Sequence, residues 1–280
     1  MTIPASAAET PRRIFSPIAA NYDRPAQLLG LLQYTRWHDF LLSRLSLTPG
    51  DRVLDMATGT GALAVRLAGR DGLHVTGADI TRPMLLQAAM RPNPARPDPE
   101  QGRRIEGSPA RSAGRAEARV ARPACPEPGE GRASGGIEPT AAPDFIECTA
   151  ETVPFADGAF DAVIFSYLLR YVADVPATLS ELARALKPGG TMASLDFAVP
   201  RGIWYPLWRL YTAVGLPLGG ALLSPAWRRV GSFLGPSIRG FYGRWPEERL
   251  LQLWRESGFP NAQAKRLSLG GAIVMWGTKR

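Results

Sequence analysis

A glycine-rich turn that follows an apolar strand constrains this chain more than any other feature. The segment Val53–Gly61 reads Val-Leu-Asp-Met-Ala-Thr-Gly-Thr-Gly, and a helical pattern begins at Ala62. Gly59 and Gly61 allow the backbone to approach a ligand closely, and the first turn of the helix presents free N–H groups. A strand, a glycine turn and a helix in this order predict a pocket for a nucleotide-like cofactor.

Two acidic residues narrow the choice of cofactor. Asp79 ends the next strand pattern, eighteen residues after Gly61, where a carboxylate can accept hydrogen bonds from ribose hydroxyls. Gly59, Gly61 and Ala64 also satisfy the alanine-terminated dinucleotide fingerprint. However, Asp55 ends the first strand, where a carboxylate repels a pyrophosphate and tolerates a cationic methionine group, and the chain has no Tyr-x-x-x-Lys pair. These features favour a sulfonium donor over NAD.

Strand and helix patterns alternate over most of the chain. Strands are expected at 52–55, 74–79, 145–148, 160–166, 191–197, 261–268 and 271–278. Helices are expected at 62–68, 81–90, 175–186 and 246–258. This alternation predicts an α/β fold with a doubly wound, mostly parallel sheet of seven strands over residues 49–280. Residues 1–48 are expected to form a helical segment on the substrate side.

Residues 91–143 differ in composition from the rest of the chain. They contain no aromatic residue and no lysine, and Pro, Gly, Arg, Glu and Ala dominate. Such a segment cannot bury enough apolar surface to offset its ordering entropy. We therefore expect a disordered insertion, whose role as a spacer or as a docking tail stays open.

Residues 199–243 are rich in aromatic side chains, with arginines interleaved, and look irregular. The uncharged stretch 210–227 within them contains three glycines and two prolines, which makes it a poor membrane-spanning helix. We interpret 199–243 as an inserted helical lid that packs over the pocket or covers a lipophilic substrate.

The charge and the cysteines limit the partners and the setting. The 33 Lys and Arg residues exceed the 25 Asp and Glu residues, for a formal net charge of +8, which suits a protein that visits anionic surfaces. No run of basic residues or RNA motif indicates nucleic acid. Cys125 and Cys148 lack metal-ligand spacing, so we expect no metal site and a reducing cytoplasm. Residues 1–9 do not resemble a signal peptide.

Several blocks together carry a family resemblance. The glycine turn, Ala150–Asp161 and Arg184–Gly190 resemble class I S-adenosylmethionine methyltransferases. Three further segments resemble the ubiquinone/menaquinone biosynthesis C-methyltransferase family: Phe15–Asp23 with Trp37, Ser166–Arg170 and Gly270–Val274. The resemblance implies a Rossmann-like methyltransferase domain that binds S-adenosyl-L-methionine.

The resemblance also implies a set of site residues. Cofactor contacts would fall on Asp55, Gly59, Thr60, Gly61, Asp79, Thr149, Ala150 and Ser166. Catalysis would rest on Arg170, with Tyr22 and Asp196 as secondary candidates. The implied reaction transfers a methyl group to a ring carbon of a demethylated quinol, with Arg170 stabilising the phenolate. The structural alternative for Arg170 is an ion pair with Asp174, one helical turn away.

The acceptor half of the chain departs from the family pattern. Tyr171 replaces the usual Asn, Asp196 replaces Glu, and the N-terminal box differs at Pro25, Ala26, Gly30 and Tyr34. Three alternatives therefore stay open: a methyltransferase for another lipophilic small molecule, an NAD-dependent oxidoreductase, and a non-catalytic membrane binder. A lipophilic quinol is the expected partner, with contact to the inner face of the membrane and a homodimer left open.

Overall fold

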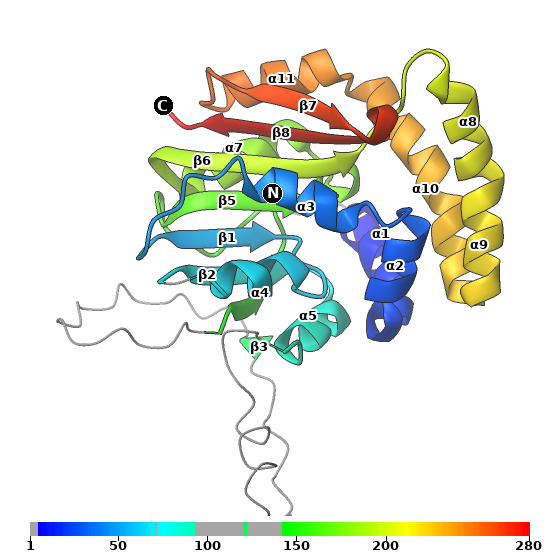
Figure 1. Ribbon diagram of the computed structural model, residues 1–280. Helices are drawn as coiled ribbons and strands as arrows, with labels where there is room; N and C mark the ends of the chain where they lie inside the picture. Colours follow the sequence, from blue (N-terminus) through cyan, green and yellow to red (C-terminus); the bar gives the residue numbers. More distant parts are fainter. Residues whose placement is uncertain (1–4, 71, 93–119, 122–141) are drawn as a thin grey trace, which may run out of the picture.

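A twisted mixed sheet forms the centre of the computed structural model, which describes residues 5–70, 72–92, 120–121 and 142–280 (Figure 1). Within these residues the strand order is β3-β4-β2-β1-β5-β6-β8-β7. The strands are β1 (Arg52–Met56), β2 (His74–Asp79), β3 (Val120–Ala121), β4 (Asp144–Glu147), β5 (Phe160–Ser166), β6 (Leu186–Phe197), β7 (Gln263–Leu267) and β8 (Ala272–Thr278). The pairs from β3 to β6 are parallel, and β8 is antiparallel to both β6 and β7.

The predicted doubly wound sheet is confirmed, and all seven expected strands form. The short strand β3 adds an eighth at the edge, where it pairs with β4. It lies inside 91–143, so the expectation of disorder does not hold for Val120–Ala121, whose backbone joins the sheet. Residues 93–119 and 122–141, on which most of that prediction falls, lie outside the described residues.

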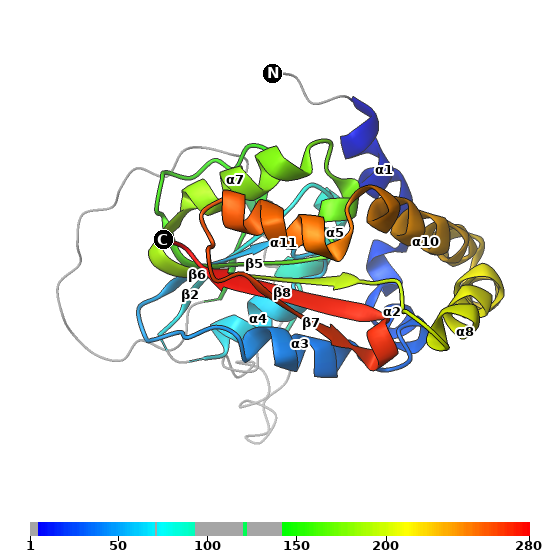
Figure 2. The ribbon, with the colours of Figure 1, turned by 90° about the horizontal axis from the view of Figure 1, so that it is seen from above.

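Helices cover both faces of the sheet because its central strands are apolar on both sides, as in other parallel sheets (Figure 2). Val163 and Ile164, neighbours on β5, are both fully buried and point to opposite faces. One face packs against α7 (Val175–Ala185) and α11 (Glu247–Glu256). The other face packs against α3 (Tyr34–Leu42), α4 (Ala62–Ala68) and α5 (Arg82–Ala89).

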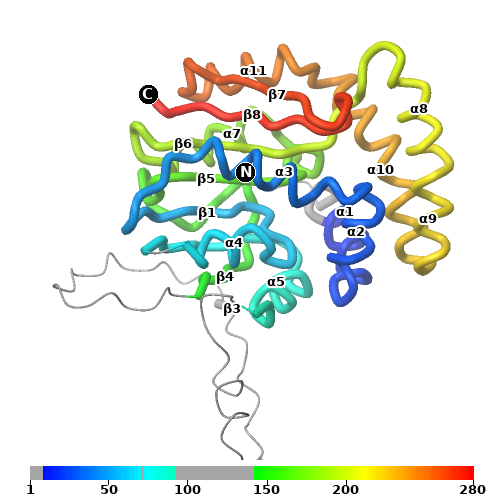
Figure 3. Tube along the Cα trace, viewed as in Figure 1, coloured from blue at the N-terminus to red at the C-terminus, as the bar shows by residue number. Residues whose placement is uncertain are grey.

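The lid consists of helices, although the sequence of residues 199–243 looks irregular. It comprises α8 (Trp204–Leu210), the π-helical segment η3 (Tyr211–Gly215), α9 (Leu216–Leu223) and α10 (Pro225–Arg244), which folds back along α9 (Figure 3). A Cβ atom on Gly220 would lie 2.4 Å from the carbonyl oxygen of Trp227, and one on Gly231 would lie 2.3 Å from that of Leu216. The glycines that look like helix breakers thus allow two helix backbones to meet.

The N-terminal helices close the carboxyl end of the sheet. They are α1 (Ala5–Phe15), the 3₁₀ helix η1 (Ser16–Asn21) and α2 (Asp23–Leu29), and Figure 1 shows α1 and α2 between the sheet and the lid. Ile18, Ala19 and Trp227 belong to one buried cluster that joins these helices to α10. No helix among the described residues is long and apolar enough to cross a bilayer.

Candidate active site

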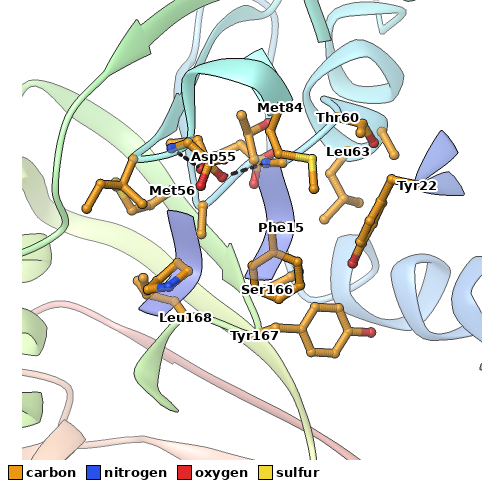
Figure 4. Close-up of a pocket in the computed structure, with 18 of the residues that line it drawn as sticks. Phe15, Tyr22, Asp55, Met56, Thr60, Leu63, Met84, Ser166, Tyr167 and Leu168 are labelled. Carbon is orange, nitrogen blue, oxygen red and sulfur yellow. Dashed lines mark hydrogen bonds between the residues drawn. The ribbon is translucent and has the colours of Figure 1, made fainter. Parts of the chain in front are cut away.

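A cavity of about 240 Å³ lies at the carboxyl ends of β1, β2 and β5. At this edge β2 and β5 lie on opposite sides of β1, so the strand order changes direction there. Doubly wound folds bind ligands in the crevice at such a point. Seven of the eight predicted cofactor residues line the cavity: Asp55, Gly59, Thr60, Asp79, Thr149, Ala150 and Ser166. Figure 4 shows Asp55, Thr60 and Ser166 around one space with the rings of Phe15, Tyr22 and Tyr167.

The two glycines of the turn do different jobs. Both have a positive φ, 56° at Gly59 and 74° at Gly61. A Cβ atom on Gly59 would meet nothing within 4 Å, whereas one on Gly61 would lie 2.8 Å from the Cβ atom of Ala88 on α5. Gly61 is not among the residues that line the cavity, so its contact with the cofactor stays a prediction. Its small size serves the packing of α4 against α5.

Asp79 is held rigidly at the end of β2. The side chain is buried, and its carboxylate accepts the backbone N–H groups of Gly59 at 2.9 Å and Thr81 at 2.7 Å. Burial raises the pKa of Asp79, although these hydrogen bonds oppose the shift. Each carboxylate oxygen keeps a lone pair for a further hydrogen bond, which suits recognition of ribose hydroxyls.

Asp55 is a buried acid with a raised pKa beneath the glycine turn. It is 1% exposed and accepts a hydrogen bond from the Thr58 hydroxyl at 2.7 Å. Burial raises its pKa to about 7, with a smaller contribution in the same direction from Asp79. A cationic ligand beside Asp55 would favour the ionised carboxylate, so this position attracts a positively charged donor and disfavours a pyrophosphate.

A polar latch joins the turn to the N-terminal helices. The Thr60 hydroxyl donates to Asp23 at 2.6 Å, and Arg91 donates to the backbone carbonyl of Thr60 at 2.8 Å and pairs with Asp23. Sequence analysis grouped Arg91 with the insertion by composition and Asp23 with the N-terminal box. Neither position gave a signal that the two side chains meet across 68 residues.

The remaining predicted cofactor residues close the cavity on the β4 and β5 sides. Ala150 is buried, and Thr149 forms an isolated bridge with Thr152. The Oγ atom of Ser166 is buried and has no hydrogen-bond partner among the described residues. Buried polar atoms in folded proteins are nearly always paired, so a ligand group in this cavity would satisfy Ser166.

A second cavity, of about 170 Å³, lies between the first cavity and the lid. Five aromatic residues and one alanine line both cavities: Phe15, Tyr22, Ala26, Tyr34, Tyr167 and Tyr171. The lid contributes Trp208, Tyr211 and Leu216 to the second cavity. The two cavities therefore adjoin along these mainly aromatic side chains, and the second has largely apolar surroundings.

Arg170 is the buried cation of the second cavity. Its side chain is 1% exposed, and its Nε atom donates to Asp196 at 2.9 Å. Burial alone would lower the pKa of Arg170, but Asp196 and Tyr171 together raise it by more, so the guanidinium stays protonated. The alternative pairing with Asp174 is wrong, because Asp174 caps α7 by accepting the N–H of Ala177 at 2.9 Å.

The structure separates the three predicted catalytic residues by position. Tyr22 lines both cavities and stacks on Trp227, and Arg170 lines the second cavity. Asp196 lines neither and contacts Arg170 and the backbone N–H of Phe197, so it is a positioning residue rather than a catalytic one.

Sequence analysis missed Tyr167, which lies between the two cavities. Its hydroxyl is buried without a hydrogen-bond partner among the described residues, and its ring stacks on Phe197. Its φ of 59° lies in the left-handed region, where a bulky side chain is strained. The residue follows Ser166 in a block already assigned to the substrate side, but the backbone conformation that turns its ring is not readable from the sequence.

A profile of the ubiE/COQ5 methyltransferase family matches residues 5–95 and 130–279. The chain belongs to this family. A Desulfotalea psychrophila protein named ubiquinone/menaquinone biosynthesis C-methyltransferase UbiE is 31% identical over 269 residues, which cover 95% of this chain and 89% of the relative. A Tropheryma whipplei demethylmenaquinone methyltransferase is 30% identical over 265 residues, which cover 94% and 89%.

Solved methyltransferases share the fold of this ubiE/COQ5 family member. A Thermotoga maritima S-adenosylmethionine-dependent methyltransferase superposes with a TM-score of 0.55 at 17% identity, over 96% of this chain and 99% of that one. Haemonchus contortus phosphoethanolamine N-methyltransferase 2, in complex with S-adenosyl-L-methionine, gives 0.50 at 16%, over 87% and 52%. At such identities the likeness shows the fold alone.

Family membership confirms the predicted enzyme class, so the protein is an S-adenosylmethionine-dependent methyltransferase. This membership excludes the oxidoreductase and non-catalytic alternatives. The residues at the first cavity fit that donor: a ribose acceptor at Asp79, an acid for a cationic group at Asp55, and an unpaired hydroxyl at Ser166.

Proposed function

We propose that this methyltransferase transfers the methyl group of S-adenosyl-L-methionine to a ring carbon of a demethylated, prenylated quinol of the demethylmenaquinol kind. The observation that carries the proposal is the buried Arg170 in an apolar cavity that adjoins the proposed donor cavity. The names of the relatives from Desulfotalea psychrophila and Tropheryma whipplei support the same acceptor class.

In this proposal the donor occupies the first cavity. Asp79 accepts the ribose hydroxyls, Thr149 and Ala150 lie beside the base, and Ser166 gains its missing hydrogen-bond partner. Asp55 attracts the positively charged methionine part of the donor. The donor supplies an activated sulfonium, so the protein mainly aligns it and excludes water.

The acceptor quinol occupies the second cavity. Its ring carbon becomes nucleophilic when a neighbouring hydroxyl ionises, and the protonated Arg170 stabilises the resulting phenolate. The ring carbon would take the methyl group as the bond from sulfur to that group breaks, and the sulfur would keep the electron pair of that bond as a neutral thioether. The ring proton would then pass to water as aromaticity returns. Because a guanidinium does not give up its proton at working pH, Arg170 acts by charge and not as a base.

A second candidate is a methyltransferase for another lipophilic small molecule. Tyr171, which replaces the usual Asn of the family, supports it. The Tyr171 ring stacks on Phe233 of the lid with centroids 6.1 Å apart, and its hydroxyl accepts from Arg170 at 3.4 Å. A bulky phenol beside Arg170 favours a smaller or differently substituted ring.

Incubation with S-adenosyl-L-methionine and a panel of demethylated quinols, followed by mass spectrometry, tests the proposal. We expect a mass gain of one methyl group on a demethylmenaquinol, and about a hundredfold or greater loss in Arg170→Ala. Full activity of Arg170→Ala would show that the acceptor site is misplaced. Methylation of a different lipophilic phenol in the same panel would favour the second candidate.

A further inference from the structure

The outer face of the lid carries a continuous row of exposed apolar side chains. The row runs along α8, η3 and α9 and is called the lid stripe here: Ile203, Leu207, Leu210, Val214, Leu218 and Leu222. Their exposure ranges from 45% at Val214 to 89% at Leu222. Successive members are three or four residues apart, so they share one face of the helix, over a length of about 29 Å.

A second group of exposed leucines adjoins the lid. Leu28, Leu31 and Leu32 follow from the end of α2 and are 59%, 63% and 69% exposed. The Tyr211 hydroxyl donates to the carbonyl of Leu29, and a Cβ atom on Gly219 would lie 3.0 Å from the Leu29 side chain. Leu28, Leu31 and Leu32, called the turn leucines here, therefore lie next to a segment that contacts the lid, and Figure 1 shows α2 beside α9 on the side of the molecule away from β3 and β4.

The chain around this surface is basic. Residues 199–244 contain six arginines and no Asp, Glu or Lys. Arg201 pairs with Glu248 at 2.9 Å, but the other five make no ion pair with a described residue: Arg209, Arg228, Arg229, Arg239 and Arg244. Arg228 and Arg229 border an open depression with Ala221, the neighbour of Leu222 at the end of the lid stripe. Unpaired guanidinium groups beside exposed leucines are complementary to an anionic, apolar-cored partner.

We propose that the lid stripe and the turn leucines dock on the surface of an anionic lipid bilayer. A second copy of the chain fits less well, because a face-to-face contact would bring the unpaired arginines of two lids together. The helix lies along the surface with its leucines among the acyl chains and its arginines at the phosphates, as interfacial amphipathic helices do.

The second cavity and the proposed surface share one residue, Leu31. Leu31 from the turn and Trp208, Tyr211 and Leu216 from the lid all line that cavity. A docked enzyme would therefore present its acceptor cavity to the bilayer, and a lipophilic acceptor could enter without crossing water. This access route rests on the proposed acceptor class, whereas docking itself does not.

Co-sedimentation with vesicles tests the docking directly. We expect binding to vesicles of equal parts phosphatidylglycerol and phosphatidylcholine, and much weaker binding to phosphatidylcholine alone, with a loss in high salt. Leu210→Glu combined with Leu218→Glu should weaken binding at least about tenfold. Leu86→Glu on α5, a change at a leucine outside this surface, is the matched control and should bind normally. Arg228→Gln and Arg229→Gln should each weaken binding about fivefold.

Two outcomes would overturn the proposal. One is equal vesicle binding by the Leu210→Glu, Leu218→Glu variant and the wild type. The other is a dimer in light scattering that this variant converts to monomer, which would identify the surface as a contact between copies. Methyl transfer to a water-soluble, short-chain quinol should be unchanged in the variant, so loss of docking is distinguishable from failure of the proposed reaction.

Discussion

Removal of Asp196 tests whether the buried ion pair holds the acceptor side together. The Arg170 side chain is 1% exposed and that of Asp196 is 13% exposed, so Asp196→Ala leaves a buried guanidinium with only the Tyr171 hydroxyl, at 3.4 Å, as a described partner. It also removes the acceptor of the Phe197 N–H at 2.7 Å. Breaking a buried pair in this way costs about 3–5 kcal/mol of unfolding free energy.

Thermal unfolding at neutral pH measures this loss. At about 2–4 °C per kcal/mol, the melting temperature of Asp196→Ala should fall by about 6–20 °C. Asp157→Ala is the matched control, because Asp157 also pairs with an arginine, Arg184, at 2.7 Å but is 83% exposed. The control should lose no more than about 1 kcal/mol.

A paired replacement separates folding from chemistry. Arg170→Met combined with Asp196→Leu removes both charges and should recover most of the stability while remaining inactive. Equal losses for Asp196→Ala and Asp157→Ala, or a double variant no more stable than Asp196→Ala, would refute the reasoning.

Three further outcomes follow from the first cavity and its border. The pKa of Asp55 is raised to about 7 in the folded protein, so the folded state holds a proton that the unfolded chain releases above its ordinary pKa of 3.8, and stability falls as pH rises between these values. In urea unfolding, the unfolding free energy of Asp55→Asn relative to that of the wild type should therefore increase by about 4 kcal/mol from pH 4 to pH 7. A difference that stays constant with pH would contradict the shift. Gly61→Ala should lose about 1–3 kcal/mol more than Gly59→Ala in the same assay, because only the former meets Ala88; equal losses would mean that φ alone matters. Tyr167→Phe should unfold at the wild-type temperature or slightly above it, because its hydroxyl is unpaired, yet lose methyl transfer; unchanged activity would remove Tyr167 from the site.

The donor half of the site was predictable because it depends on local sequence. A strand, a turn and a helix are contiguous, so Asp55 and Gly59 were predicted from their place in this pattern, Asp79 from the end of the next strand, and Thr60 from the family resemblance. The role of Gly61 was not predictable, since its constraint comes from Ala88 on a separate helix.

The acceptor half depends on contacts between distant segments. Arg170 could be singled out by resemblance, but its partner Asp196 lies 26 residues away on β6, whereas helix spacing alone suggested the nearer Asp174. The lid was harder still, because glycines within it serve helix–helix contact, and local propensity interprets them as breaks.

The latch at Arg91 defines where the chain can be cut and rejoined. Arg91 pins the backbone beside Thr60 and Asp23 at the point where the long insertion begins. A shortened enzyme that joins residue 92 to residue 142 would keep this anchor and the start of β4, and would lose only the edge strand β3. A shortening that also removed Arg91 would leave Asp23 with the Thr60 hydroxyl as its remaining described hydrogen-bond partner and weaken the link between α2 and the turn, so the boundary for engineering lies one residue beyond that arginine.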